Sequence, residues 1–173
     1  MKYLLAPIFL MFLSSSYSQT YLYDGNNIKP RFEIYPDRIY ENIKGKRVLA
    51  LEIEDTRLYL PSKMGYDGAG NPSIVPRQLV FSVSGEKGYT YFKENGYNLR
   101  YDYHLEDDLC YTPSDGMLYP MMKLIRTTES SAKICKWFPE HYNELLARVE
   151  WKGKQNTFDT LFLFYLANLK SND

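Results

Sequence analysis

Apolar and polar residues alternate in short stretches along the chain, and Gly, Pro, Asn or Asp residues separate the stretches. Alternation with a period of two sends successive side chains to opposite faces, which is typical of a half-buried β-strand. Such stretches occur at 31–36, 46–60, 77–85, 119–127, 132–137 and 146–153. Roughly seven to nine short strands at this spacing predict a mainly β protein, either a single antiparallel β-sandwich or an incomplete barrel with one or two short helices.

The tyrosine-rich segment 87–104 predicts a β-hairpin, because Asn95 and Gly96 at its centre form a strong short signal for a hairpin turn. Tyrosine combines a large rigid ring with a polar tip, which favours a protein interface or a platform that stacks on sugars. A sheet face that is simply covered in tyrosine is the structural alternative. The hairpin residues predicted to contact a partner are Tyr89, Tyr91, Tyr97, Tyr101 and Tyr103.

The segment 156–169 has two alternative interpretations. It is apolar on both faces over 161–166, which favours a central β-strand paired with the strand before it. A helix is the rival, because Leu161, Phe162 and Tyr165 also fit a helical spacing. The strand is the favoured interpretation, and the helix stays open.

Short helical turns are predicted at two other places. In 138–148, Pro139 occupies a position typical of a first helical turn. In 36–46, Asp37 is placed as a cap and Gly45 as a stop.

The first 18 residues predict a cleavable export signal. A basic residue precedes an apolar run at 4–13, and Ser16 and Ser18 provide the small-residue pattern that a signal peptidase accepts. The apolar run is shorter than the ~20 residues that a membrane-spanning helix needs, and a buried N-terminal element is the alternative. We therefore expect a periplasmic or secreted protein with a signal peptide at 1–18 and a single β-rich domain at 19–173.

The charge of the chain narrows the classes of partner. Lys and Arg together number 21, and so do Asp and Glu. A near-neutral chain has no electrostatic footprint for nucleic acid or for an anionic membrane. No later segment has the length and apolar character of a membrane span, so we expect no membrane insertion after signal cleavage.

Cys110 and Cys135 are the two cysteines of the chain. Paired cysteines in an oxidising compartment are interpreted first as a disulfide, so we expect a bond between them. A metal pair or a reactive nucleophile is the alternative, although no C-x-x-C motif or neighbouring histidine cluster favours either.

The segment 61–76, bounded by two prolines, predicts a long exposed loop. Its YDGAGN core has the composition of a calcium loop, but the third position counted from Asp67 is Ala69, which has no oxygen ligand. Connections of this length in a compact domain are often functional, and an ordinary surface loop is the alternative. The loop residues predicted to contact a partner are Tyr66, Asp67 and Asn71.

No catalytic, cofactor or metal motif stands out in the chain. The G-x-S-x-G turn of serine hydrolases is absent. His104 precedes three acids at 106–108, which together could bind a divalent ion, although a solvated strand end is the favoured interpretation. His141 and Glu144 are interpreted as a surface pair. An enzyme is therefore not the leading prediction, and no cofactor or metal is predicted.

The stretch DLCYTPSDGMLYPMMKLI followed by SAKIC, at 108–135, resembles the paired-cysteine core of small bacterial periplasmic type VI secretion immunity proteins. The resemblance implies a protein that binds a secreted toxin and occludes its active site. The leading prediction is therefore an exported immunity or inhibitor protein with a toxin or an enzyme as its partner. A carbohydrate- or surface-binding module with a tyrosine-rich face, and a small secreted hydrolase, are the alternatives.

Overall fold

The structure is a computed structural model that describes residues 19–93, 97–152 and 159–169, and every structural statement below concerns these residues. The expected signal peptide at 1–18 and the Asn95-Gly96 turn lie outside them. The export signal and the domain boundary at residue 18 therefore stay predictions.

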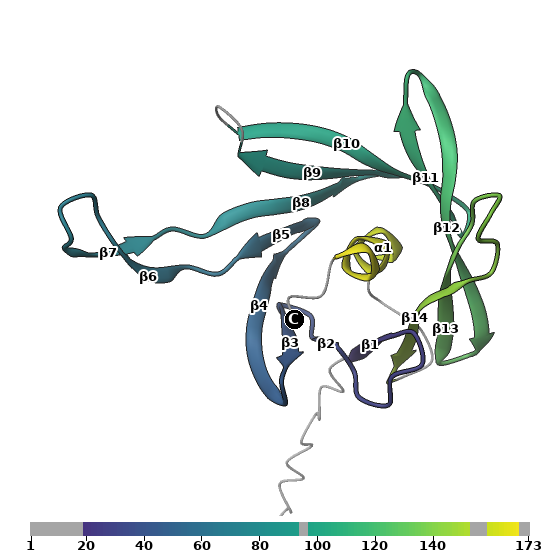
Figure 1. Ribbon diagram of the computed structural model, residues 1–173, viewed down its shortest axis with the longest axis horizontal. Helices are drawn as coiled ribbons and strands as arrows, with labels where there is room; N and C mark the ends of the chain where they lie inside the picture. The colour runs from purple at the N-terminus through teal and green to yellow at the C-terminus, as the bar shows by residue number, and fades with distance from the viewer. Residues whose placement is uncertain (1–18, 94–96, 153–158, 170–173) are drawn as a thin grey trace, which may run out of the picture.

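Twelve antiparallel strands form a closed barrel (Figure 1). In spatial order they are β1 (Thr20–Asp24), β14 (Leu145–Trp151), β13 (Ser131–Lys136), β12 (Met117–Thr128), β11 (Leu109–Ser114), β10 (Tyr97–Glu106), β9 (Lys87–Lys93), β8 (Gln78–Ser84), β5 (Arg57–Leu60), β4 (Lys46–Glu54), β3 (Arg38–Ile43) and β2 (Phe32–Ile34). A separate two-stranded sheet consists of β6 (Lys63–Tyr66) and β7 (Pro72–Val75). The alternating stretches of the sequence all fall on strands, which confirms the mainly β class.

Strand β1 closes the barrel. Thr20 pairs with Trp151 of β14 on one side and with Ile34 of β2 on the other. The sequence predicted a sandwich or an incomplete barrel, and the structure corrects this to a closed one. The closing contact joins the first and the last strand of the chain, so no local pattern of residues reveals it.

The barrel interior is filled by a helix, α1 (Thr160–Asn168), which Figure 1 shows end-on at the centre of the strands. The prediction of a strand at 156–169 was therefore wrong. Asp159 caps the helix, because its carboxylate accepts a hydrogen bond from the Leu161 amide at 2.8 Å. A helix surrounded by barrel wall must be apolar on every side. A central strand is also apolar on both faces, so the sequence pattern did not distinguish the two. Its buried residues are Leu161, Phe162, Leu163, Phe164 and Leu166.

Two aromatic residues of the wall hold the helix in place. The ring of Phe81 stacks on Tyr165 with 4.3 Å between centroids and meets Phe162 edge-on at 5.9 Å. Tyr103 points inward and is 4% exposed, and its hydroxyl accepts a hydrogen bond from Asn168 at 3.0 Å. A barrel of twelve strands is wider than side chains from the wall alone can fill, so α1 provides a large part of the core.

The two short helical turns predicted elsewhere do not form helices. Segment 36–46 is the β3–β4 hairpin, whose turn at Lys44 and Gly45 has positive φ angles of 50° and 79°. Strand pairing prevails there because Ile39 and Glu41 alternate into the interior. Segment 138–144 consists of turns and bends that lead into β14.

The predicted disulfide is absent: Cys110 and Cys135 are both free and buried. Cys110 lies on β11 opposite Met122 of β12, and Cys135 lies on β13 opposite Lys123 of β12. One whole strand therefore separates the two cysteines. Adjacent strands lie about 4.8 Å apart, so the two Cα atoms are about 10 Å apart, beyond the ~7 Å that a disulfide spans.

Helix α1 is too short to cross a membrane, and the described residues contain no longer apolar helix that would do so.

Candidate functional site

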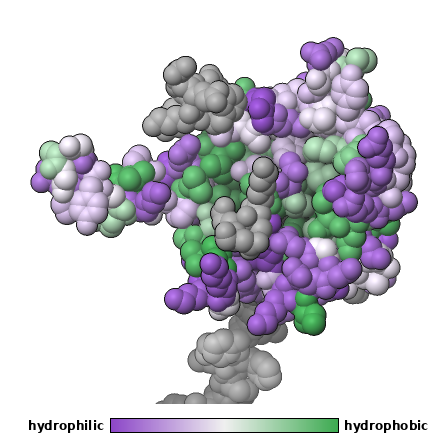
Figure 2. Space-filling model, viewed as in Figure 1, coloured by the Kyte–Doolittle hydropathy of each residue, from purple (hydrophilic) through white to green (hydrophobic). Residues whose placement is uncertain are grey.

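The most prominent feature outside the barrel is the hairpin of β6 and β7, which we call the arm (residues 63–75). It projects sideways from the wall, and Figure 2 shows it standing clear of the body of the molecule (Figures 1 and 2). The segment predicted as a long loop at 61–76 is therefore an ordered hairpin. It is inserted between β5 and β8, which pair directly with each other, as at Tyr59 and Leu79.

One face of the arm is apolar and uncovered. Met64 pairs with Ile74, and Tyr66 pairs with Pro72, so these four side chains share a face. Met64, Tyr66 and Ile74 are 72%, 79% and 72% exposed. An isolated two-stranded ribbon is marginally stable, and these side chains are largely exposed to solvent. A contiguous exposed apolar face of this kind is typical of a protein contact surface.

The tip of the arm is organised by Asp67. Its Oδ1 accepts hydrogen bonds from the amides of Ala69 at 2.9 Å and Asn71 at 2.8 Å, and its Oδ2 accepts one from the Asn71 side chain at 3.3 Å. These bonds, from Asn71 above all, lower the pKa of Asp67. Asp67 and Asn71 therefore hold the conformation of the tip. Of the three loop residues predicted to contact a partner, Tyr66 is the one whose side chain takes no part in these hydrogen bonds. Between them, residues 68–70 are Gly, Ala and Gly, so the tip is narrow.

The tyrosines of the β9–β10 hairpin are divided between the two faces of the wall. Tyr89 and Tyr101 pair on the outer face with 5.6 Å between ring centroids, and Tyr91 lies on the same face, partly buried. A β-bulge between Tyr101 and Tyr103 turns Tyr103 into the core, so it does not belong to the outer surface. The side chain of Tyr97 lies outside the described residues.

Basic side chains cover many of the outer tyrosines. Among the described residues, a guanidinium or ammonium group lies 3.9–5.7 Å from a tyrosine ring centroid in six such pairs, which are Arg47–Tyr35, Arg47–Tyr40, Arg77–Tyr59, Arg148–Tyr23, Lys87–Tyr101 and Lys152–Tyr21. These contacts combine cation–π attraction with packing of the aliphatic stems. Much of the high tyrosine content is therefore accounted for by the outer surface of the barrel itself.

The two histidines do not bring acids together into a metal site. The His104 ring lies between Tyr101 and Tyr111, with centroid separations of 6.3 and 6.4 Å. His141 contacts Glu144 at 2.7 Å on the exposed surface, as predicted. Among the described residues, no group of three His, Cys, Asp or Glu side chains is placed to hold a metal ion.

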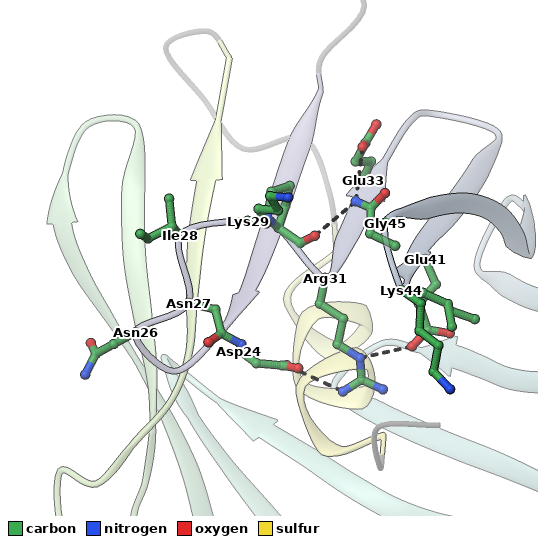
Figure 3. Close-up of a pocket in the computed structure, with 13 residues that line it drawn as sticks. Asp24, Asn26, Asn27, Ile28, Lys29, Arg31, Glu33, Glu41, Lys44 and Gly45 are labelled. Atoms are coloured by element: carbon green, nitrogen blue, oxygen red, sulfur yellow. Dashed lines mark hydrogen bonds and ion pairs between the residues drawn. The ribbon is translucent and has the colours of Figure 1, made fainter. Parts of the chain in front are cut away.

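A polar cavity of about 830 Å³ lies at the end of the barrel where α1 terminates (Figure 3). The β1–β2 connection and the β3–β4 turn form its walls. Arg31 occupies its floor, with Nε donating to Glu41 at 3.1 Å and Nη1 facing Asp24 at 3.4 Å. Nη1 also donates to the carbonyl oxygen of Leu169 at 2.8 Å.

The sequence interpretation missed this cavity and its ionic floor. Arg31 and Glu41 are 10% and 11% exposed as side chains, so this is a largely buried ion pair. One sequence signal was present: Glu41 occupies an inward position, two residues after Ile39, on a strand that alternates. A charge at an inward strand position indicates a buried partner of opposite sign.

Comparison of the chain with known protein families, with curated proteins and with solved structures finds no match.

Proposed function

We propose that this protein is an exported inhibitor that binds a secreted toxin or enzyme and blocks its active-site cleft with the arm. The observation that carries the proposal is the uncovered apolar face of the arm, formed by Met64, Tyr66, Pro72 and Ile74. The predicted export signal supports the compartment, and the resemblance at 108–135 supports the immunity class.

The arm is not needed to close the barrel, so barrel closure does not explain why the arm is present. Strands β5 and β8 pair with each other from Arg57 to Leu60, so the wall is continuous on the barrel side of the insertion. Exposed apolar side chains favour aggregation and contribute little to stability. Their retention on a projecting hairpin is therefore best explained by a partner that covers them.

The shape of the arm suits insertion into a concave partner. Its tip carries no side chain larger than a methyl group between Asp67 and Asn71, and the bulky pair Tyr66–Pro72 follows immediately behind. The bonds to Asp67 organise the tip before binding, which lowers the entropy cost of association. Tyr66 is placed to act as an aromatic anchor near the deepest point of contact.

The test compares the mature protein with the double variant Met64→Ser/Ile74→Ser in affinity capture from periplasmic extract. The matched control is Val48→Ser/Leu99→Ser, which removes two exposed apolar side chains, 46% and 52% exposed, from β4 and β10. We expect the wild type and the control to retain the same protein, and the arm variant to lose it.

The captured protein is then purified and its own activity is measured with and without the wild type and each variant. Inhibition by the wild type and by the control, lost with the arm variant, supports the proposal. Capture without inhibition, or equal inhibition by the arm variant, would overturn it.

A second candidate function is carbohydrate binding on the outer face of β9 and β10. The favouring observation is the Tyr89–Tyr101 pair, beside which Tyr101 also lines a groove of about 400 Å³ with the β11–β12 turn. Saccharide-dependent quenching of tyrosine fluorescence that disappears in Tyr101→Ala, and persists in Met64→Ser/Ile74→Ser, would favour this function over inhibition.

A further inference from the structure

We propose that the polar cavity at the end of the barrel is a binding site for a small zwitterionic ligand, of the size of an amino acid or a dipeptide. The proposal is independent of the arm, and the proposed inhibitor function does not require it.

The size of the cavity fits a small organic molecule. Its volume of about 830 Å³ lies within the 300–1,000 Å³ that is usual for ligand sites. Both of its walls are turns, the β1–β2 connection at 25–31 and the β3–β4 turn at Lys44 and Gly45 (Figure 3). Functional groups are often placed on connections that a rigid barrel positions.

The floor of the cavity is ionic, and a buried ion pair is weak evidence for a role in stability. The desolvation free energy of a pair such as Arg31–Glu41 can exceed its attraction, and apolar replacements are often equally stable. Arg31 is held by Glu41, by Asp24 and by the carbonyl of Leu169. This arrangement fixes the positions of two carboxylates against one guanidinium at the base of a cavity that is open to solvent.

The charges around the cavity are balanced and spatially separated. Arg31, Asp24 and Glu41 lie at the floor, while Lys29 and Lys44 are exposed on the two bordering turns (Figure 3). Glu33 also lines the cavity and contacts Arg47 at 3.2 Å. A ligand of a single sign therefore meets as many repelling as attracting groups.

A zwitterion matches this distribution. Its carboxylate is attracted by a rim ammonium group, that of Lys29 on one bordering turn or that of Lys44 on the other. Its ammonium group is attracted by Asp24, whose side chain is 35% exposed although Oδ1 faces Arg31. The amides of Asn26 and Asn27, which also line the cavity, provide neutral hydrogen-bonding groups between the two ends.

The site is connected to the helix that fills the barrel. Arg31 Nη1 bonds to Asp24 and to the Leu169 carbonyl, so a ligand that orders Asp24 also holds the end of α1. Binding is therefore expected to raise the Tm of the whole protein, as any ligand that binds only the folded state does.

The experiment is isothermal titration of the purified mature protein with each of the twenty common L-amino acids and with L-alanyl-L-alanine, up to 10 mM. Propionate, ethylamine and trehalose test a lone carboxylate, a lone ammonium group and a neutral polyol. We expect at least one zwitterion to bind, at least ten times more tightly than any of these three, and to raise the Tm.

Variants localise the site. Lys29→Ala/Lys44→Ala and, separately, Asp24→Asn should weaken binding at least tenfold, while Lys133→Ala, an exposed lysine on β13, should leave it unchanged. Circular dichroism confirms the fold of each variant. Absence of binding for all zwitterions, tighter binding of trehalose or of a single-sign probe, or unchanged binding by the rim variants would overturn the proposal. Loss of partner capture in the arm variant leaves these titrations unaffected, so the two proposals fail separately.

Discussion

Cys110 and Cys135 lie on opposite sides of β12, each opposite a residue of that strand, and both thiols are free. Even in an oxidising compartment, their formation of a disulfide would require β12 to leave the barrel. Unfolding the non-reduced protein in guanidinium should therefore expose two thiols per chain to maleimide, measured as a mass increase. The folded protein should react slowly, since Cys110 and Cys135 are 0% and 4% exposed. A chain that takes up no label after unfolding would show that the disulfide exists.

Stability should decline at alkaline pH because three buried groups favour their protonated forms. Burial raises the pKa of Tyr103 and of Tyr165 from 10.0 to about 12, and that of the Cys110 thiol from 9.0 to about 12. Below pH 9 all three are protonated in both states and contribute fully. As pH rises from 9 to 12 the unfolded chain releases its protons first, so the free energy of unfolding falls.

Urea midpoints at pH 7, 9, 10 and 11 measure this decline. Tyr165→Phe removes one of the three titrating groups, so its loss of stability over the same pH range should be smaller than that of the wild type. A midpoint that stays constant up to pH 11 in the wild type would contradict the expectation.

Truncating a side chain inside the barrel should lower the free energy of unfolding strongly. Phe164→Ala removes a fully buried ring from α1, and such changes lower the free energy of unfolding by about 3–5 kcal/mol. Leu99→Ala, at a position 52% exposed on β10, should change it by less than about 0.5 kcal/mol. Urea unfolding monitored by circular dichroism gives both values. Equal values for the two variants would show that the helix does not pack as described.

Removing one partner of the Arg31–Glu41 pair should lower the free energy of unfolding strongly, whereas replacing both with apolar residues should lower it little. Glu41→Gln removes the negative charge that faces a largely buried guanidinium at 3.1 Å and should cost about 3–5 kcal/mol. The double change Arg31→Met/Glu41→Leu removes both charges and should recover most of that stability. A double variant as unstable as the single one would show that the ion pair stabilises the fold and would count against a role in ligand binding.

The order of the arm tip should depend on one carboxylate. In Asp67→Ala the amides of Ala69 and Asn71 lose their acceptor, so both should exchange with solvent deuterium faster than in the wild type. Exchange of barrel amides such as that of Leu58 should be unchanged, because β5 pairs with β4 and β8 and not with the arm. Accelerated exchange throughout the barrel would contradict the separation of arm and barrel.

The strands were predictable from sequence because alternation is a local property, as along Leu79, Phe81 and Val83. Features that depend on distant segments were not. The apolar run at 161–166 fits a helix as well as a strand, and the run alone does not show that the barrel wall surrounds it. Tyr103 turns inward at a bulge after Tyr101, which the alternation of tyrosines does not show. The free thiols follow from strand order, which no spacing of cysteines reveals.

The candidate sites divide in the same way. Tyr66 could be selected from its place in an exposed glycine-rich segment, although the hairpin around it could not. The role of Arg31 could not be predicted from the sequence, because its partners Asp24, Glu41 and Leu169 come from three separate parts of the chain.

The direct pairing of β5 with β8 at the base of the arm has a consequence for how this protein can diverge. Changes in the length or composition of residues 63–75 can therefore occur without shifting the register of any barrel strand. The barrel is in this sense a constant scaffold, and the arm is a variable insertion. Related chains would then differ most at this insertion and least at the strands that flank it.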